Sequence, residues 1–214
     1  MEKHTVLIGI IATLTCSLLL VSGCTQQNST PSPESLQAIL EKAAIIESMY
    51  SELEISTAIN GSLEQSTTMK IWQKTPYLRE EENSTTGGIT TSRTFIKRPE
   101  GIYRYDATLK TYQSDPQIVI SQPFTADMVN DLLKNQTITI LGAETIDGNT
   151  TTVIQYTPIQ AGNSTTITIW VWNEKGVPLK TRSITKNQGI TKTIDSTYKN
   201  YSFSVISDST FSVE

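Results

Sequence analysis

The stretch Ile167–Leu179, ITIWVWNEKGVPL, decides the fold, because it contains a strand, a tight turn and the beginning of another strand. β-branched and aromatic residues fill its first half, and such residues favour an extended strand. Lys175-Gly176 is then typical of a hairpin turn, and Pro178-Leu179 begins a new extended segment. The stretch therefore predicts two neighbouring antiparallel strands.

The same period-two pattern continues along most of the chain on both sides of this hairpin. Turn residues such as Gly61, Gly87-Gly88 and Asp147-Gly148-Asn149 separate the extended segments. The expected strands lie near residues 52–60, 64–73, 77–82, 89–97, 101–106, 110–113, 136–146, 150–158, 164–173, 177–187 and 190–205. These segments, about eleven in number, predict a long antiparallel sheet.

Two segments have helical spacing instead. Ser32-Pro33-Glu34 combines a capping hydroxyl, a proline suited to a first turn and an acid, and apolar residues then recur at helical spacing as far as about residue 50. Pro123-Phe124-Thr125 begins a second, shorter helix. Two helices are too few to cover both faces of such a sheet. We therefore predict an α+β fold in which a strongly curved antiparallel sheet, a half-barrel, wraps around the two helices.

The N-terminus predicts export and lipid attachment. The apolar run Val6–Val21 is short for a spanning helix, and a small-residue cleavage site follows it. Val21-Ser22-Gly23-Cys24 resembles the lipobox of bacterial and archaeal lipoproteins, so we expect cleavage before Cys24 and a lipid on that cysteine. An ordinary secretory signal or a signal anchor is the alternative. The predicted organisation is a signal peptide over 1–23, a polar tether over 24–33 and one domain over 34–214, held at the extracytoplasmic face of the cell membrane.

The residues left after this cleavage exclude several kinds of chemistry. The chain has one histidine, His4, and two cysteines, Cys16 and Cys24, so the mature domain would have no imidazole and no free thiol. A Ser-His-Asp triad, a Cys-His pair and the usual zinc sites all need these groups. We therefore expect no enzymatic activity, no cofactor and no metal site. Glu80-Glu81-Glu82 is interpreted as a solvated strand end, since consecutive strand residues point to alternate faces.

The polar surface residues bear on partners and modification. The net charge is −4 and no basic patch is visible, which argues against a nucleic-acid partner. Asn-x-Ser/Thr sequons, which are N-glycan acceptors in exported proteins, occur at Asn28, Asn60, Asn83, Asn135, Asn149, Asn163 and Asn200. The alternative is that a chain rich in Asn and Thr produces sequons by chance.

Four stretches of the chain resemble the LolA/LolB/RseB superfamily of half-barrel proteins, which has archaeal members. They are Met69–Pro76 (MKIWQKTP), Gly101–Asp106 with Tyr112, Ile167–Leu179, and Tyr198–Ser202 followed by Ile206–Asp208 and Phe211. Their order along residues 34–214 carries the resemblance. In the bacterial carriers an arginine that lines the cavity precedes the proline of the first motif, whereas Thr75 takes that place here. Together with the lipobox and the sequons, the resemblance implies an archaeal cell-surface lipoprotein.

The resemblance also implies a function. We expect the concave face to bind a hydrophobic ligand, a lipid or an acyl or isoprenoid chain, while the lipid on Cys24 supplies the membrane contact. The expected lining residues are Trp72, Phe95, Tyr103, Tyr105, Trp170 and Trp172. The alternative for each aromatic residue is simple packing on the helices. The alternative for the whole protein is an RseB-like envelope sensor or protein-interaction module without a lipid cargo. The sequence leaves the oligomeric state open.

Overall fold

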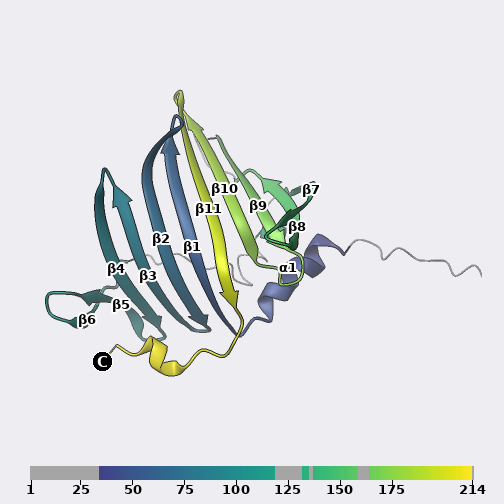
Figure 1. Cartoon of the computed structure of the whole chain (residues 1–214). Helices are drawn as coiled ribbons and strands as arrows, with labels where there is room; N and C mark the ends of the chain where they lie inside the picture. Colours follow the sequence, from purple (N-terminus) through teal and green to yellow (C-terminus); the bar gives the residue numbers. More distant parts are fainter. Residues whose placement is uncertain (1–33, 119–131, 135–136, 159–163, 214) are drawn as a thin grey trace, which may run out of the picture. The chain divides into compact units, whose positions relative to one another are not determined.

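The computed structural model describes residues 34–118, 132–134, 137–158 and 164–213 (Figure 1). The predicted signal peptide and tether lie outside these residues, and so does Cys24. No helix within the described ranges is both long enough and apolar enough to cross a membrane.

In the described part of the chain, eleven strands form one antiparallel sheet, which confirms the predicted fold class. The strands are β1 (Ser48–Ile59), β2 (Ser62–Lys74), β3 (Tyr77–Thr86), β4 (Ile89–Arg98), β5 (Gly101–Asp106), β6 (Thr111–Ser114), β7 (Thr139–Ile146), β8 (Asn149–Tyr156), β9 (Ser164–Trp172), β10 (Pro178–Asn187) and β11 (Ile190–Ser202). Their spatial order is β6-β5-β4-β3-β2-β1-β11-β10-β9-β8-β7. The first and last strands therefore pair at the centre of the sheet, and β6 and β7 lie at its two open edges.

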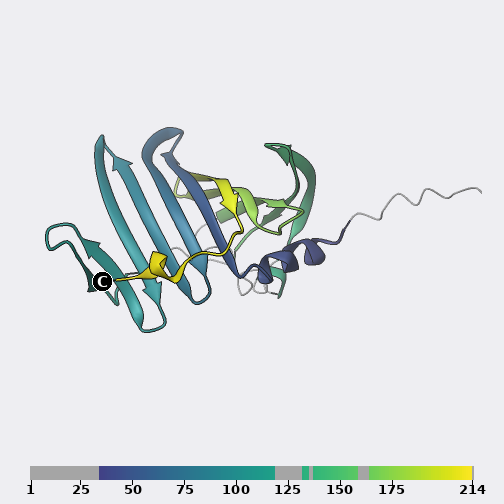
Figure 2. The same cartoon turned by 60° about the horizontal axis from the view of Figure 1, so that its bottom comes forward.

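The sheet is twisted and curved rather than flat. The direction of the strands changes strongly between β4 and β8, as a comparison of the two views shows (Figures 1 and 2). Right-handed twist accumulates from strand to strand, so an eleven-stranded sheet cannot remain planar without special support. The result is the open half-barrel that the sequence predicts.

The two faces of the sheet have different partners. We call the face that packs against α1 (Leu36–Ala44) the inner face and the opposite one the outer face. Ile39 and Leu40 of α1 form a buried cluster with three inner-face residues, Ile154, Ile169 and Val171. The inner face continues across the centre of the sheet, because Ile169, Thr181, Ser196 and Ile55 are paired in register on four successive strands.

Helix α1 is shorter than the predicted helix. Ser35 caps it by accepting a hydrogen bond from the backbone N–H of Ala38 (3.2 Å), and the helix ends at Ala44. The prediction of a helix as far as residue 50 is wrong, since residues 48–50 already belong to β1. Tyr50 is paired with Trp72 of β2, and their rings lie 5.1 Å apart. Cross-strand pairing thus prevails over the local helical spacing.

The turn between β9 and β10 fixes the position of α1. Gly176 has φ +74°, and a Cβ atom built there would lie 2.3 Å from the carbonyl oxygen of Ile39 and 2.8 Å from the backbone nitrogen of Ala43. Lys42 of α1 donates a hydrogen bond to the carbonyl oxygen of Asn173 (2.7 Å) in the same turn. Only glycine permits so close an approach between the turn and the helix.

The second predicted helix falls mostly outside the described residues. Residues 132–134 are described, and they are helical. Leu132 is buried in the same cluster as Ile39 and Leu40 of α1. This segment therefore contributes to the core on the inner face, as α1 does.

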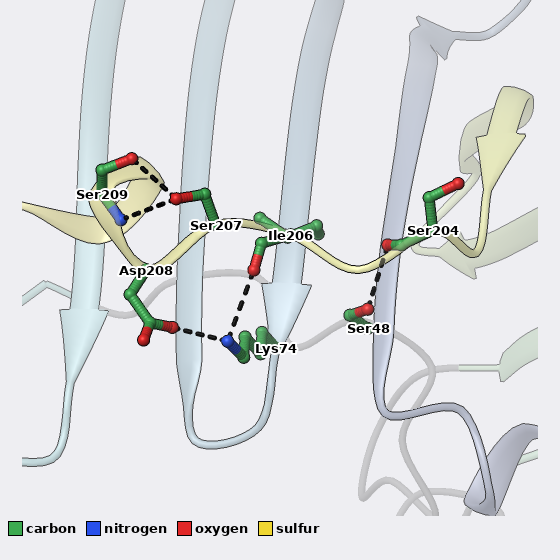
Figure 3. A network of polar contacts seen from close by, with 7 residues as sticks. All are labelled: Ser48, Lys74, Ser204, Ile206, Ser207, Asp208 and Ser209. Carbon is green, nitrogen blue, oxygen red and sulfur yellow. Dashed lines mark hydrogen bonds and ion pairs between the residues drawn. The ribbon is translucent and has the colours of Figure 1, made fainter.

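The C-terminal segment crosses one end of the outer face (Figure 3). Lys74 at the end of β2 donates to the carbonyl oxygen of Ile206 (3.3 Å) and forms an ion pair with Asp208 (2.5 Å). The segment continues into a 3-10 helix, η1 (Asp208–Phe211), whose Phe211 is buried and stacks on Tyr77 at 5.5 Å. The second half of the last motif, Ile206–Asp208 with Phe211, therefore lies across the ends of the strands and is bound to them.

Candidate ligand-binding face

The six aromatic residues expected to line a cavity do not lie together. Alternation along paired strands places Phe95 on the inner face, and it places Trp72, Tyr103, Tyr105 and Trp170 on the outer face. Trp172, at the end of β9, packs with Tyr201 and Phe203 beside the end of α1. Of the six, only Phe95 therefore belongs to the apolar patch of the inner face described below.

Two of the outer-face aromatic residues, Trp72 and Trp170, already have neighbours that account for them. Trp72 packs against Tyr50 with the two rings tilted by 48°, and it lies under the guanidinium of Arg79. Trp170 donates its indole N–H to Glu144 (2.9 Å) and has the ammonium of Lys180 4.8 Å above its ring. Cation–π contacts of this kind stabilise exposed sheet surfaces. Trp72 and Trp170 thus have a packing role, as the alternative to ligand binding expected. Their partners are strand residues, however, and not the helices.

A different set of side chains forms an apolar patch on the inner face of β1 to β4. Its buried members are Leu53, Met69, Ile71, Leu78 and Phe95, and partly buried Ile55, Ile102, Ile118 and Tyr198 pack against them. Leu53 and Ile55 of β1 are two residues apart, as are Met69 and Ile71 of β2, which is the spacing of side chains on one face of a strand. Most of these residues are aliphatic, so a prediction based on aromatic type does not find them, whereas one based on strand faces would. We call this set of side chains the inner patch.

Glu80 lies within the inner patch. In register it is flanked by Ile71 of β2 and Phe95 of β4, and its exposed fraction is 2%. Burial raises the pKa of this carboxyl to about 8, and the nearby charge of Glu82 adds to the effect. The prediction of a solvated strand end is therefore wrong for Glu80. The strand continues to Thr86, so this residue lies in its middle, whereas Glu81 points to the outer face and pairs with Arg79 (2.7 Å).

Hydroxyl groups replace the apolar side chains farther along the same face. Ser84 of β3 accepts hydrogen bonds from Gln65 (2.8 Å) and Thr67 (3.0 Å) of β2, and both Thr67 and Ser84 are buried. A similar pair, Thr165 and Thr185, joins β9 and β10 at 3.0 Å. The inner face thus changes from apolar around Phe95 to hydroxyl-lined beyond it, which suits an amphipathic molecule.

An acidic hollow on the outer face is a poorer site. Its lining includes Glu52, Glu54, Lys70 and Glu81. The acids already have partners: Glu52 accepts hydrogen bonds from Tyr50 and Asn200, Glu54 pairs with Lys199, and Glu81 pairs with Arg79. A metal site would need at least three histidine, cysteine, aspartate or glutamate side chains close together. Within the described ranges no such group could hold a metal ion.

Four of the predicted glycan acceptors lie within the described residues. Asn60, Asn83 and Asn200 are exposed, and Asn149 is half-buried at the start of β8. The side-chain oxygen of Asn60 accepts a hydrogen bond from the backbone of Thr191 (2.8 Å). Asn28, Asn135 and Asn163 lie outside the described residues. Glycosylation of these positions stays a prediction.

Comparisons with known proteins agree with this architecture. No protein-family model matches the chain, and no curated protein matches its sequence. An uncharacterized conserved protein from Thermus thermophilus is similar in structure, with a TM-score of 0.52 and 9% identity over 83% of this chain and 93% of that one. The lipoprotein LppX of Mycobacterium tuberculosis has a TM-score of 0.49 and 14% identity, over 83% of this chain and 100% of that one. A LolA superfamily protein from Nitrosomonas europaea has a TM-score of 0.35 and 14% identity, over 84% of this chain and 98% of that one.

The likeness to the Thermus thermophilus protein indicates a shared fold. At these identities the likeness concerns the fold alone, and function has to be argued from the site. The half-barrel implied by the sequence motifs is confirmed, whereas the predicted archaeal source has no support among these proteins.

Proposed function

We propose that this chain is a membrane-anchored extracytoplasmic lipoprotein whose half-barrel binds a hydrophobic ligand on the inner face. The observation that carries the proposal is the inner patch, where Phe95 and four other buried apolar side chains from β1 to β4 form one cluster. Burial of apolar ligand surface there would supply about 25 cal/mol per Å², less the cost of ordering the ligand. Binding rather than catalysis also fits a domain without histidine or cysteine.

The ligand-binding function is tested on the full chain carrying Cys24→Ser. Native mass spectrometry is expected to show a co-purifying lipid, and the purified protein is expected to take up a neutral naphthylamine dye with increased fluorescence. A clean mass without bound lipid, together with no dye uptake, would refute ligand binding. That outcome would favour the alternative, an RseB-like sensor that acts by contact with another protein.

Neighbouring residues of β1 provide a matched pair of variants for this assay. Ile55 points to the inner face and packs on the inner patch, whereas Ser56 points to the outer face, and both are half-buried. We expect Ile55→Lys to weaken dye binding about tenfold or more, because an ammonium must then be buried or displaced. Ser56→Lys should leave binding unchanged. Equal effects of the two variants would place the dye elsewhere.

The anchor makes a separate prediction. With Cys24 replaced by serine, no thiol remains at the cleavage site to receive a lipid, so the exported protein should no longer stay with the membrane. Fractionation of cells into membrane and soluble material, followed by immunoblotting, measures this. Membrane retention equal to that of the wild type would contradict the lipobox assignment, and Cys16→Ser is the control that should leave retention intact.

A further inference from the structure

Among the described residues of the inner face, two polar side chains have a buried oxygen without a hydrogen-bond partner. These oxygens are Oε1 of Glu80 and Oε1 of Gln73. Glu80 lies opposite Ile71, and Gln73 lies opposite Leu78, so the two polar residues are diagonal neighbours across β2 and β3. A buried polar atom without a partner costs free energy, and a group that pairs with it recovers that cost. Two unsatisfied polar positions therefore lie close together beside the apolar side chains of the inner patch.

The protonation state of Glu80 determines what it can bind. Burial raises its pKa to about 8, so at neutral pH the carboxyl keeps its proton and acts as a hydrogen-bond donor. Other charged groups on the inner face near it are Glu82 on β3, Arg93 and Lys97 on β4, and Arg104 on β5. Of these charges, only that of Glu82 influences the pKa of Glu80, and it adds to the larger effect of burial. None of the described residues pairs with the buried oxygen.

We propose that Glu80 and Gln73 recognise an oxygen-bearing group of the ligand, so that the ligand is a long-chain alcohol or ester and not a plain hydrocarbon chain. The proposal rests on the proposed function, since it assumes that the inner face holds an apolar ligand. The O–H of Glu80 donates to the ester or hydroxyl oxygen. The side-chain oxygen of Gln73 accepts a hydrogen bond, which a ligand hydroxyl can supply and an ester cannot.

A cationic amphiphile fits this place less well. An ammonium would need Glu80 ionised, and the burial that holds its proton opposes ionisation. Apart from the oxygen of Gln73, the neighbours Ile71, Leu78 and Phe95 offer an ammonium no acceptor, so its other N–H groups would be buried without partners. The structure therefore favours a neutral oxygen function.

The test uses the full chain with Cys24→Ser and measures displacement of the neutral dye at pH 6.5. The competitors share one chain length: dodecane, methyl dodecanoate, 1-dodecanol and dodecylamine. We expect the ester to bind about fivefold to tenfold better than the alkane, the range given by one hydrogen bond in an apolar site, and the alcohol to bind better still. Glu80→Leu should abolish the preference for the ester, whereas Glu80→Gln, which keeps a donor, should retain part of it. Gln73→Leu should remove only the advantage of the alcohol over the ester.

The pH dependence gives a readout that a structural role alone would not produce. The ester preference should disappear as the pH rises through about 8, where Glu80 loses its proton. Glu82→Gln removes the neighbouring charge, so it should keep the preference at pH 6.5 and move its loss to lower pH. An unchanged ester-to-alkane ratio in Glu80→Leu would overturn the assignment of Glu80, as would a preference for dodecylamine over the alcohol. Absence of dye uptake by the Cys24→Ser protein would instead overturn the underlying binding function.

Discussion

Gly176→Ala is expected to lower the free energy of unfolding by about 4 kcal/mol, from overpacking together with left-handed backbone strain. The added Cβ would lie 2.3 Å from the carbonyl oxygen of Ile39, and its neighbour at 2.8 Å, the nitrogen of Ala43, is also a backbone atom of α1. Helix backbone cannot move aside without shifting the helix. Because Ile39 and Leu40 are buried against β8 and β9, such a shift would open the core on the inner face.

Gly189→Ala is the matched control for this variant. Gly189 has a similar left-handed conformation, with φ +81°, but a Cβ atom there has nothing within 4 Å. It should therefore lose only about 1 kcal/mol, the cost of the backbone conformation. Urea unfolding of both variants in the Cys24→Ser background, followed by tryptophan fluorescence, provides the comparison. Equal losses would show that α1 does not depend on a close approach at Gly176.

The strands were predictable from sequence because the signals that define them are local. Alternating apolar residues and turn residues such as Asp147-Gly148-Asn149 lie close together in the chain, and the turn between β7 and β8 forms there. The end of α1 was not predictable in this way. Ile46 and Tyr50 continue the helical spacing, yet Tyr50 is paired with Trp72, which is distant in sequence. The tertiary pairing determines the boundary and the local pattern does not.

The site depends on the same distinction between local and distant information. Which face of a strand becomes the inner one is determined by register across several strands and by the contact of α1 with β9, so aromatic type alone misplaced Trp72 and Trp170. Glu80 was missed because the predicted strand ended at residue 82. With β3 extended to Thr86, alternation would have placed Glu80 on the same face as Leu78, away from the solvent.

Glu80 should make the stability of the domain fall as the pH rises. At pH values below 4.5, the ordinary pKa of glutamate, the carboxyl is protonated in both the folded and the unfolded chain. Its ionisation then has no effect on stability. Between 4.5 and about 8 the unfolded chain loses this proton while the folded chain keeps it, and stability declines with pH. The expected loss from pH 4.5 to pH 7 is about 3 kcal/mol, at 1.36 kcal/mol per pH unit. Above pH 8 this contribution should become constant.

Glu80→Gln removes the ionisation and should therefore flatten this part of the pH profile and stabilise the domain at pH 7. Glu81→Gln is the control, since Glu81 is adjacent in sequence but lies on the outer face in an ion pair with Arg79. The control should keep the pH profile and lose less than about 1 kcal/mol, as is usual for a partly exposed ion pair. The measurement is urea unfolding at intervals between pH 4 and pH 9. A profile in Glu80→Gln that parallels the wild type would mean that Glu80 ionises freely in the folded protein, and hence that the inner patch admits water.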